Sequence, residues 1–595
     1  MAINFERNKE LAPLTTFGVP ARAAYYAEYS SRRELEKITR SPIFLENEVL
    51  HIGEGSNLLF LGDYKGLVLR STIMGKEIYE GHDRHTFLIA GAGEKWSDLV
   101  DFAVANGLAG LENLAGIPGS VGASAVQNVG AYGREAGDLI FAVECFDTLK
   151  REPVRFTAEE CRFGYRDSMF KHEGRGRYVV MRVSYLLKKS ELAECLDYGP
   201  LRQLEQRLGH TPTIAEVAAE VVAVRNAKLP DPAFIGSAGS FFKNPVIDTY
   251  YYREEVMPRT EGMRVFEVGE RRVKLPAAWL IDHAGLKGER VGGAQVWEKQ
   301  PLVLANTGNA TGRDVIALAK AVCDRVQEMF GVDLRPEVNI IDPEIHIRVL
   351  GSGTSKGIPE IGCTCRVCKS SDTRDKRMRS SVLVNVSGMN ILIDPSPDFR
   401  MQALNNDIRH VDAVLITHSH YDHVGGIDDL RPLCANGDIP FYVRKDVDSD
   451  LRRRLDYCFR EHLYPGVPKF DMHIIGTDPF LVNGVKIIPV EVFHGKLPIL
   501  GFRIGNFGYI TDAKTIEPEE REKLRGLKVL IVNALRKNEH FAHFSLQEAL
   551  NLIAEVRPER AYLTHFNHQI GTHAELSCQL PAGVFPAYDG LEITC

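Results

Sequence analysis

The sequence lacks a long apolar run. No stretch of its 595 residues approaches the roughly 20 apolar residues that a bilayer span requires. The N-terminal residues, MAINFERNKE, carry charges where a signal peptide would have an apolar core. From these two absences we expect a cytoplasmic protein without a membrane partner.

The sequence also lacks an excess of positive charge. Its formal net charge of -7 argues against a general nucleic-acid binder, so nucleic acid is not expected as a partner. A local basic cluster, Arg374, Lys376, Arg377 and Arg379, is interpreted as solvated surface. The 11 cysteines are odd in number and spread over a long chain, which favours free thiols over a disulfide framework.

A GxGxxG motif followed by a helix and a later acidic residue is absent, which argues against a Rossmann site. Instead, three strand-like apolar runs, the third covering residues 114–118, lead into glycine turns at residues 53–57, 91–94 and 119–123. Glycine lets backbone N–H groups approach a phosphate closely, so clustered turns suit a dinucleotide pyrophosphate. Taken singly, the turns fit plain hairpins equally well.

Length and histidine usage divide the chain. At 595 residues it is too long for one hydrophobic core, and we expect three or four structural domains. One alternating run stops at Asp342-Pro343, and a second opens at Ile345. Six of the 19 histidines precede Ile345, which leaves 13 for the shorter second part and points to metal chemistry there.

The first part contains a series of recognisable segments. In order they are TTFGVPARA, GEGSNLLF, GAGEKW, GLENLAGIPGSVGASAVQNVGAYG, ECRFGYRDSMFK, AKLPDP, GSAGSFFKNP, AAWLIDHAGLKG and LRPEV. This series, from about Phe17 to Ile341, resembles the UDP-N-acetylenolpyruvoylglucosamine reductase family. The family consists of flavoenzymes that make UDP-N-acetylmuramate for peptidoglycan.

The resemblance implies an α+β multidomain fold. We expect an FAD-binding domain of the vanillyl-alcohol-oxidase type at residues 1–188 and an α+β substrate domain at residues 189–342. The implied cofactor is FAD, the hydride donor NADPH and the substrate a UDP-sugar. The implied cofactor-binding residues lie in two of the glycine turns: Gly53, Gly55, Ser56, Asn57, Gly119, Ser120, Gly122 and Ala123.

Three catalytic residues are implied by motif match. Arg166 would hold the substrate carboxylate and stabilise developing charge, because a guanidinium is planar and always protonated. Ser240 matches the proton donor and Glu337 the assisting acid. Implied substrate contacts are Tyr198, Lys228 and Asn244. Without the resemblance, Arg166 would be interpreted as a surface ion-pair partner, Ser240 as a turn hydroxyl and Glu337 as a solvated strand residue.

The second part opens with a cysteine cluster. Cys363, Cys365 and Cys368 lie within six residues and can converge on one tetrahedral zinc, with the fourth ligand coming from elsewhere. Three buried, inert cysteines are the alternative. The spacing alone therefore predicts an incomplete structural zinc site.

The strongest chemical motif is HxHxDH, which follows a strand-like run at residues 411–416. It places His418 and His420 on one metal and Asp422 and His423 on a second. The motif is identified as that of the metallo-β-lactamase superfamily. The superfamily's remaining ligands are matched by His494, Asp512 as the bridging carboxylate, and His565. The resemblance implies an αββα sandwich at residues 345–595 with two catalytic divalent metals, Zn or Mn.

Within this superfamily, the early CxCxxC and a final HxxH resemble the cyclic phosphodiesterase of phosphonate breakdown. The resemblance implies that His568 completes the structural zinc site. His543 would contact phosphate or protonate a leaving oxygen, although a satisfied surface histidine fits as well. Asp422 would also help to position the nucleophile.

We predict a bifunctional chain, a flavin reductase joined to a metal-dependent phosphodiesterase. Alternatives for the second part are hydrolysis of a carboxylic ester, lactone or thioester, a nuclease of the tRNA-processing kind, and a non-catalytic binding module. Residues 452–466 are either a substrate-binding insert or a plain helix and loop.

Overall fold

The computed structural model describes residues 3–81, 85–172, 174–269, 271–386, 388–460, 467–483 and 485–595. The chain forms two compact units, Met1–Pro343 and Glu344–Cys595. The domain boundaries predicted at residues 188, 342 and 345 are finer than this division and stay predictions. No helix among the described residues is long and apolar enough to cross a membrane.

Two sheets form the first lobe of the N-terminal unit. One has the order β1-β2-β5-β3, with strands β1 (Glu6–Glu10), β2 (Arg22–Tyr29), β5 (Tyr64–Ser71) and β3 (Val49–Ile52). The other is antiparallel, with strands β12 (Glu152–Thr157), β11 (Ile140–Asp147), β13 (Tyr178–Lys189), β7 (His85–Gly91) and β6 (Lys76–Glu80), and β8 (Leu108–Ala109) paired to β13. The segment YVVMRVSYLL of β13 is rich in β-branched and aromatic residues, which suits this central strand.

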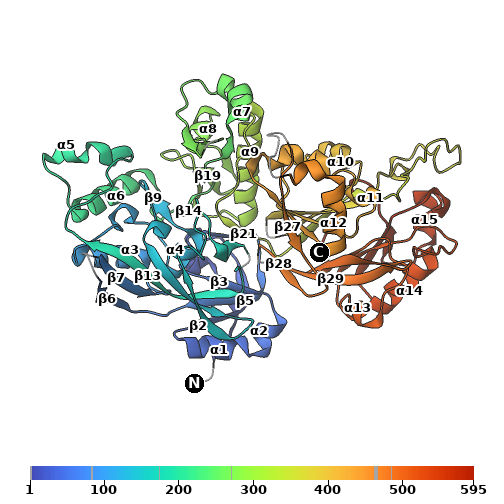
Figure 1. The fold of residues 1–595 in the computed structure, drawn as a ribbon, viewed down its shortest axis with the longest axis horizontal. Helices are drawn as coiled ribbons and strands as arrows, with labels where there is room; N and C mark the ends of the chain where they lie inside the picture. The colour runs from blue at the N-terminus through green and yellow to red at the C-terminus, as the bar shows by residue number, and fades with distance from the viewer. Residues whose placement is uncertain are drawn as a thin grey trace. The chain divides into compact units, whose positions relative to one another are not determined.

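Helices α3 (Trp96–Ala105), α4 (Val121–Gln127) and α6 (Ile214–Lys228) share one core with the six-stranded sheet (Figure 1). Thr213 and Glu216 form a capping box that starts α6 and satisfies its first backbone N–H groups. Through α6 and α5 (Leu204–Leu208), residues beyond the predicted boundary at 188 pack in the same core as residues 88–187.

One of the three runs predicted to be strand-like is not a strand. The 3-10 helix η2 (Glu112–Leu114) occupies its start, and the following residues are irregular. The reason is local, because Gly116 has a φ of +67° and Pro118 has no N–H to donate to a sheet. The other two runs are β3 and β7.

The second lobe of this unit is built around a small sheet and a long helix. The sheet has strands β14 (Gly236–Ser240), β20 (Val303–Asn306), β19 (Ala294–Val296) and β18 (Arg290–Val291). Helix α9 (Gly312–Phe330) buries Val315, Leu318 and Val322 against it, beside α8 (Ala277–His283). A three-stranded sheet completes the lobe, with strands β15 (Val246–Asp248), β17 (Arg272–Lys274) and β16 (Phe266–Val268).

The last segment of the unit joins its two lobes. Strand β21 (Asn339–Ile341) pairs in parallel with β4 (Leu58–Phe60) of the first lobe. Just before it, the Glu337 N–H donates to the carbonyl of Phe241, which follows β14 in the second lobe, over 2.7 Å. Residues 335–341 therefore hold the end of β14 next to the turn that precedes β4.

The C-terminal unit is an αββα sandwich of two seven-stranded sheets. The first contains β27 (Phe470–Ile474), β26 (Ile439–Val443), β25 (Ala413–Leu415), β24 (Met389–Ile393), β23 (Ser381–Val386), β22 (Ile345–Gly351) and β35 (Glu592–Thr594). The second contains β28 (Phe480–Val482), β29 (Val485–His494), β30 (Leu497–Ile504), β31 (Phe507–Ile510), β32 (Val529–Asn533), β33 (Arg560–Thr564) and β34 (Val584–Pro586). Fully buried side chains such as Ile391 and Phe502 fill the space between them.

Helices cover both outer faces of this sandwich (Figure 1). On the first sheet lie α10 (Phe399–Asn405) and α12 (Lys445–Arg454), and on the second lie α14 (Leu546–Val556) and α15 (His573–Gln579). Each helix buries one apolar face, for example Leu451 of α12 and Leu552 of α14. The predicted αββα sandwich is confirmed.

The basic cluster predicted to be solvated surface includes one buried member. Arg377 is only 3% exposed, and its guanidinium donates to Ser352 Oγ over 2.9 Å and to the carbonyl of Ala587. Burial lowers the pKa of Arg377 to about 10. The prediction was wrong for this residue because four cations in sequence do not show which side chain packs inward.

Candidate functional sites

Two glycine turns of the first lobe pack against each other. A Cβ on Gly53 would lie 2.4 Å from Ser120 Oγ, so a larger residue would displace the Ser120 side chain from its position. Ser120 caps α4 by accepting from the Ala123 N–H over 3.3 Å, and Ser56 Oγ donates to the Pro118 carbonyl over 3.1 Å. The structure thus brings together the predicted cofactor-binding segments at residues 53–57 and 119–123, while the role of each residue stays a prediction.

The predicted catalytic arginine and acid are in direct contact. Arg166 Nε donates to Glu337 Oε1 over 2.9 Å, and both side chains are largely shielded from solvent. Arg166 has a φ of +56°, and its Nη2 donates to the Gly130 carbonyl over 2.6 Å. A non-glycine residue held in this conformation requires support from its surroundings.

The backbone places Ser240 beside this pair. Ser240 ends β14, and the next residue, Phe241, accepts the N–H of Glu337. On the other side, the Asn339 N–H donates to the Asn57 carbonyl over 3.1 Å, and Asn57 Nδ2 donates to the Glu337 carbonyl over 3.3 Å. The end of β14, which carries Ser240, is therefore held by the backbone close to Glu337 and to the turn at residues 53–57, while the catalytic roles stay predictions.

Sequence reasoning missed Gln127 and Lys171 in this site. Gln127 Nε2 donates to Glu337 Oε1 over 3.3 Å, and Lys171 Nζ donates to Gln127 Oε1 over 3.0 Å and to the Arg166 carbonyl over 2.9 Å. Burial, assisted by repulsion from Lys243, lowers the pKa of Lys171 to about 8. The only sequence signal was the presence of both residues inside motifs already singled out, QNVGAYG and GYRDSMFK.

The predicted substrate contacts are less closely grouped. Asn244 Oδ1 accepts from the Ala277 N–H at the start of α8 over 2.9 Å. Tyr198 is half-exposed, and its ring packs edge-on against Tyr132 at 6.4 Å. Lys228 contributes its backbone carbonyl to a hydrogen bond from Trp297 Nε1 over 3.0 Å. Their substrate roles stay predictions.

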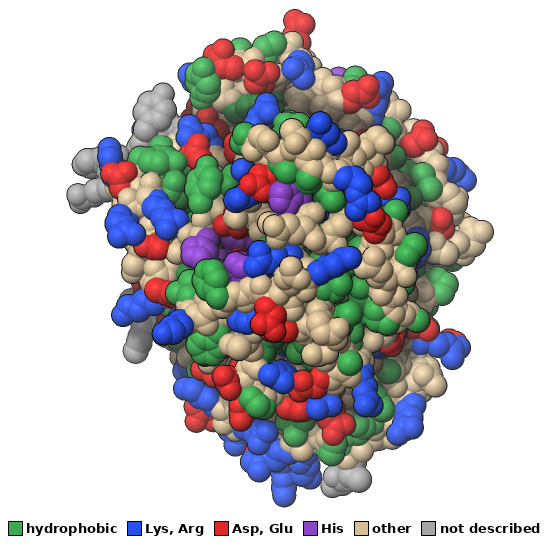
Figure 2. All heavy atoms as spheres, turned by 90° about the vertical axis from the view of Figure 1, so that its right-hand side faces the viewer, with side chains coloured by type: hydrophobic (Ala, Val, Ile, Leu, Met, Phe, Trp, Pro, Cys, Tyr) green, Lys and Arg blue, Asp and Glu red, His purple; other side chains and the backbone are tan. Residues whose placement is uncertain are grey.

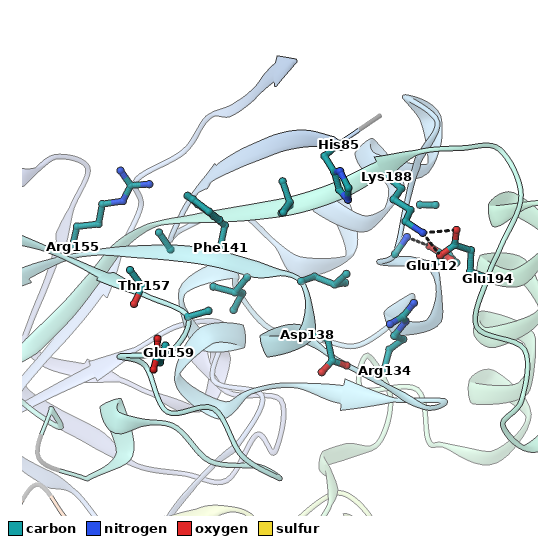
Figure 3. Close-up of a pocket in the computed structure, with 17 residues that line it drawn as sticks. His85, Glu112, Arg134, Asp138, Phe141, Arg155, Thr157, Glu159, Lys188 and Glu194 are labelled. Atoms are coloured by element: carbon teal, nitrogen blue, oxygen red, sulfur yellow. Dashed lines mark hydrogen bonds and ion pairs between the residues drawn. The ribbon is translucent and has the colours of Figure 1, made fainter. Parts of the chain in front are cut away.

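The first lobe also contains a cavity of about 990 Å³ away from these residues (Figure 3). Its lining mixes charges of both signs, with an ion pair between Lys188 and Glu194 at one end and Arg155 and Glu159 toward the other. None of the predicted site residues lines it.

In the C-terminal unit, the three cysteines converge on the predicted fourth ligand. His568 Nδ1 lies 3.3, 3.6 and 3.4 Å from the sulfur atoms of Cys363, Cys365 and Cys368. The N–H of Cys368 lowers the pKa of the Cys365 thiol, which favours the thiolate that zinc binds, whereas burial raises the pKa of the Cys368 thiol to about 11. The donor set fits a tetrahedral zinc ion.

Two further groups of ligand atoms share one carboxylate. Asp512 lies with His418 and His420 in one group and with Asp422, His423 and His565 in the other, and the ligand atoms within each group are within 4.8 Å of one another. A third group joins Asp512 to His494 and His543. The arrangement fits two neighbouring cations bridged by Asp512.

Strand ends bring these ligands together. His418 and His420 follow β25, His494 ends β29, Asp512 follows β31 and His565 follows β33. The motifs are far apart in the sequence, but the sheets bring the strand ends to one place. Burial lowers the pKa of His418, His420 and His565, which favours the neutral imidazole that metals bind.

Buried hydrogen bonds orient the histidines. His423 Nδ1 lies 2.8 Å from Asp394 Oδ2, which leaves Nε2 facing the ligand group without a hydrogen-bond partner among the described residues. His494 Nδ1 lies 2.9 Å from the Ala542 carbonyl, so it carries the proton and Nε2 is free. Sequence reasoning missed the role of Asp394, which follows β24 in the chain.

His543 lies next to the ligand histidines. Its ring centroid lies 4.5 Å from that of His494 and 5.1 Å from that of His565, and burial lowers its pKa to about 3. Two aromatic side chains close to the ligands in sequence, Tyr421 and Phe541, are 68% and 84% exposed. Figure 2 shows histidine side chains gathered near the middle of one face of the molecule, with Lys and Arg side chains around them.

The stretch 452–466 is only partly described. Residues 461–466 lie outside the described residues, and Arg452 to Arg454 end α12. Arg454 Nη1 donates to the Ser419 carbonyl inside the HxHxDH segment over 2.6 Å. The choice between an insert and a plain helix and loop stays open.

Comparison with known proteins gives three matching family models. Residues 23–149 match an FAD binding domain, residues 231–341 match the UDP-N-acetylenolpyruvoylglucosamine reductase C-terminal domain, and residues 389–566 match a Beta-lactamase superfamily domain.

Several proteins of known identity are similar to parts of the chain. The UDP-N-acetylenolpyruvoylglucosamine reductase of Chromobacterium violaceum is 42% identical over 57% of this chain and 100% of its own length, and that of Bacteroides fragilis is 44% identical over 56% and 100%. The solved structure of the enzyme from Thermus caldophilus is 29% identical over 57% of this chain and 99% of its own, with a TM-score of 0.41. A diphosphatase from the PhnP family is 38% identical over 42% of this chain and 97% of its own, with a TM-score of 0.40.

Proposed function

Because the chain belongs to the UDP-N-acetylenolpyruvoylglucosamine reductase family through its N-terminal unit, we propose that this unit reduces UDP-N-acetylenolpyruvoylglucosamine to UDP-N-acetylmuramate with NADPH as the hydride donor. The observation that carries the proposal is the contact of Arg166 with Glu337 beside Ser240. The product would serve peptidoglycan synthesis.

The residues of this unit have different roles in the proposed reaction. The turns at residues 53–57 and 119–123 would hold FAD, which supplies the hydride when bound. Arg166 holds the substrate carboxylate and stabilises the enolate-like charge that develops on it. Ser240 donates the proton to the carbon that bears the carboxylate, and Glu337 assists by hydrogen bonding and protonation.

Consumption of NADPH tests this proposal. The purified chain should consume NADPH only when the enolpyruvyl substrate is present, and without forming peroxide. Peroxide formation without substrate turnover would identify a flavin oxidase instead.

For the C-terminal unit, a hydrolase of the metallo-β-lactamase fold, we infer that the reaction is hydrolysis of a phosphodiester. Divalent cations held by the two groups that share Asp512 would activate water and neutralise charge on the attacked phosphate. Asp422 helps to position the nucleophile. His543, whose ring centroid lies 4.5 Å from that of His494, would contact a phosphoryl or leaving-group oxygen.

The observation that carries this inference is the pair of ligand groups bridged by Asp512 with His543 beside them. A substrate screen with the full chain tests it, with phosphodiesters, diphosphates, lactones and thioesters each supplied with Zn²⁺ or Mn²⁺. A preference for phosphodiesters is expected. A preference for a carbonyl substrate would contradict the inference, and no turnover of any class with metals bound would favour a binding module.

A further inference from the structure

A chain of three side chains leads from Lys171 to the predicted catalytic acid. Lys171 Nζ lies 3.0 Å from Gln127 Oε1, and Gln127 Nε2 lies 3.3 Å from Glu337 Oε1. All three side chains are partly buried. Arg166 Nε reaches the same oxygen of Glu337 over 2.9 Å.

The donor and acceptor roles in this chain are fixed by chemistry. An ammonium group has three donors and no acceptor, so Lys171 can bond only to the oxygen of the Gln127 amide. The amide nitrogen must then face Glu337 as a donor. Since the Arg166 guanidinium also has only donors, Oε1 of Glu337 accepts two hydrogen bonds, and Oε2 accepts neither of them.

We propose that Lys171 is a positioning residue, which fixes the Gln127 amide so that Gln127 and Arg166 together hold Oε1 of Glu337 as an acceptor and leave Oε2 to carry the proton. This inference rests on the proposed role of Glu337 as an acid. It assigns a function to a lysine and an amide that lie outside the two cofactor turns.

The same ammonium group supports Arg166. Lys171 Nζ donates to the Arg166 carbonyl over 2.9 Å, and Arg166 is the residue with the strained φ of +56°. One cation therefore braces both partners of the contact between Arg166 and Glu337.

The protonation state of Lys171 makes this arrangement sensitive to pH. The charged groups that face it are Lys243 and Arg175, which repel its charge, and Asp167 and Glu337, which attract it; with burial, they leave its pKa at about 8. Above that pH the neutral amine can accept as well as donate a hydrogen bond. The amide of Gln127 is then free to turn its oxygen toward Glu337, so that Oε1 loses one of its two donors.

Rapid mixing of the full holoenzyme tests the inference. Flavin reduction by NADPH and anaerobic reoxidation by the enolpyruvyl substrate are measured separately between pH 6 and pH 10. Lys171→Met should slow reoxidation at least about tenfold, since it removes part of what a positioned acid contributes, and should leave flavin reduction within about twofold. In the unmodified enzyme reoxidation should decline above about pH 8. Lys171→Arg should remove that decline, because a guanidinium stays protonated.

A second variant, Gln127→Met, tests the inference even if Lys171→Met does not fold. Gln127→Met keeps Lys171 but removes the amide, and it should slow reoxidation to a similar extent and abolish the decline above pH 8. Lys320→Met changes an exposed lysine of α9, and both its rates should equal those of the unmodified enzyme.

Each outcome decides a different point. If Glu337→Gln impairs reoxidation but Lys171→Met and Gln127→Met do not, the inference is wrong. If Lys171→Met slows both half-reactions equally and Lys171→Arg keeps the pH decline, Lys171 has only a structural role. If Glu337→Gln reoxidises at the normal rate, the proposed role of Glu337 itself is wrong.

Discussion

Arg166 Nε lies 2.9 Å from Glu337 Oε1, although 171 positions separate the two residues in the chain. The contact joins the first lobe, which carries Arg166, to the segment that leads into β21. It places a permanent cation against a carboxyl group at the predicted reaction site.

This contact predicts strong coupling between the two side chains. Arg166→Met and Glu337→Gln should each lower the rate of substrate-dependent flavin reoxidation by about 100-fold or more, since positioned acid and charge stabilisation each contribute about that much. The double variant should lose much less than the product of the two, because residues in contact act as a unit. Fully multiplicative losses in stopped-flow measurements would show that the two residues act independently.

Metal content separates the two kinds of metal site in the C-terminal unit. The purified chain should contain about three metal ions, one structural and two catalytic. Cys365→Ser should lose about one, whereas Asp512→Ala should lose the two bridged ions and keep the structural one. Cys578→Ser, which changes an exposed cysteine outside the cluster, serves as the matched control in elemental analysis. If Asp512→Ala lost all of its metal, the structural and the catalytic metal sites would not be independent of each other.

Asp394 should tune metal affinity without being a ligand. Asp394→Asn keeps the positive φ of this position, which asparagine tolerates, but presents an amide to His423 Nδ1. Metal affinity should fall by about 10- to 100-fold. Competition with a chelator measures the change, and Asp407→Asn, an exposed aspartate that also has a positive φ, should leave affinity unaltered.

The pKa of Lys171 also predicts how stability depends on pH. Its folded-state pKa of about 8 lies below the ordinary value of 10.5, so between these values the unfolded chain binds more protons than the folded one. Stability of the N-terminal unit should therefore rise as the pH increases from 8 to 10.5, by about 3 kcal/mol from this group.

Comparison with Lys171→Met isolates this contribution from other titrating groups. All three tryptophans, at positions 96, 279 and 297, lie in the N-terminal unit, so urea unfolding followed by tryptophan fluorescence reports on that unit alone. The unfolding free energy of the enzyme minus that of the variant should increase between pH 8 and pH 10. A difference that stays constant would show that Lys171 titrates normally.

The sequence predicts the metal sites better than the reductase site. HxHxDH and CxCxxC place several ligands within six residues, so their spacing alone indicates metal binding. Arg166, Ser240 and Glu337 share no local spacing, and only the order of motifs along the chain selects them. Lys171, Gln127 and Asp394 were missed because their roles depend on burial and hydrogen-bond direction, which a sequence does not show.

The segment at the end of the N-terminal unit illustrates the same limit. Its alternating pattern predicts a strand, and β21 is present. What the pattern does not show is the partner, since β21 pairs with β4 across about 280 residues. That pairing is what brings Glu337 next to the turn at residues 53–57.

The two half-reactions of the Ser240→Ala variant test the proposed proton donor most directly, with Ser237→Ala on the same strand as the control. NADPH should still reduce the flavin of Ser240→Ala rapidly, while anaerobic addition of the enolpyruvyl substrate should no longer reoxidise it. Rapid reoxidation by the substrate, or flavin reduction that is itself slow, would contradict the role of Ser240 as the proton donor.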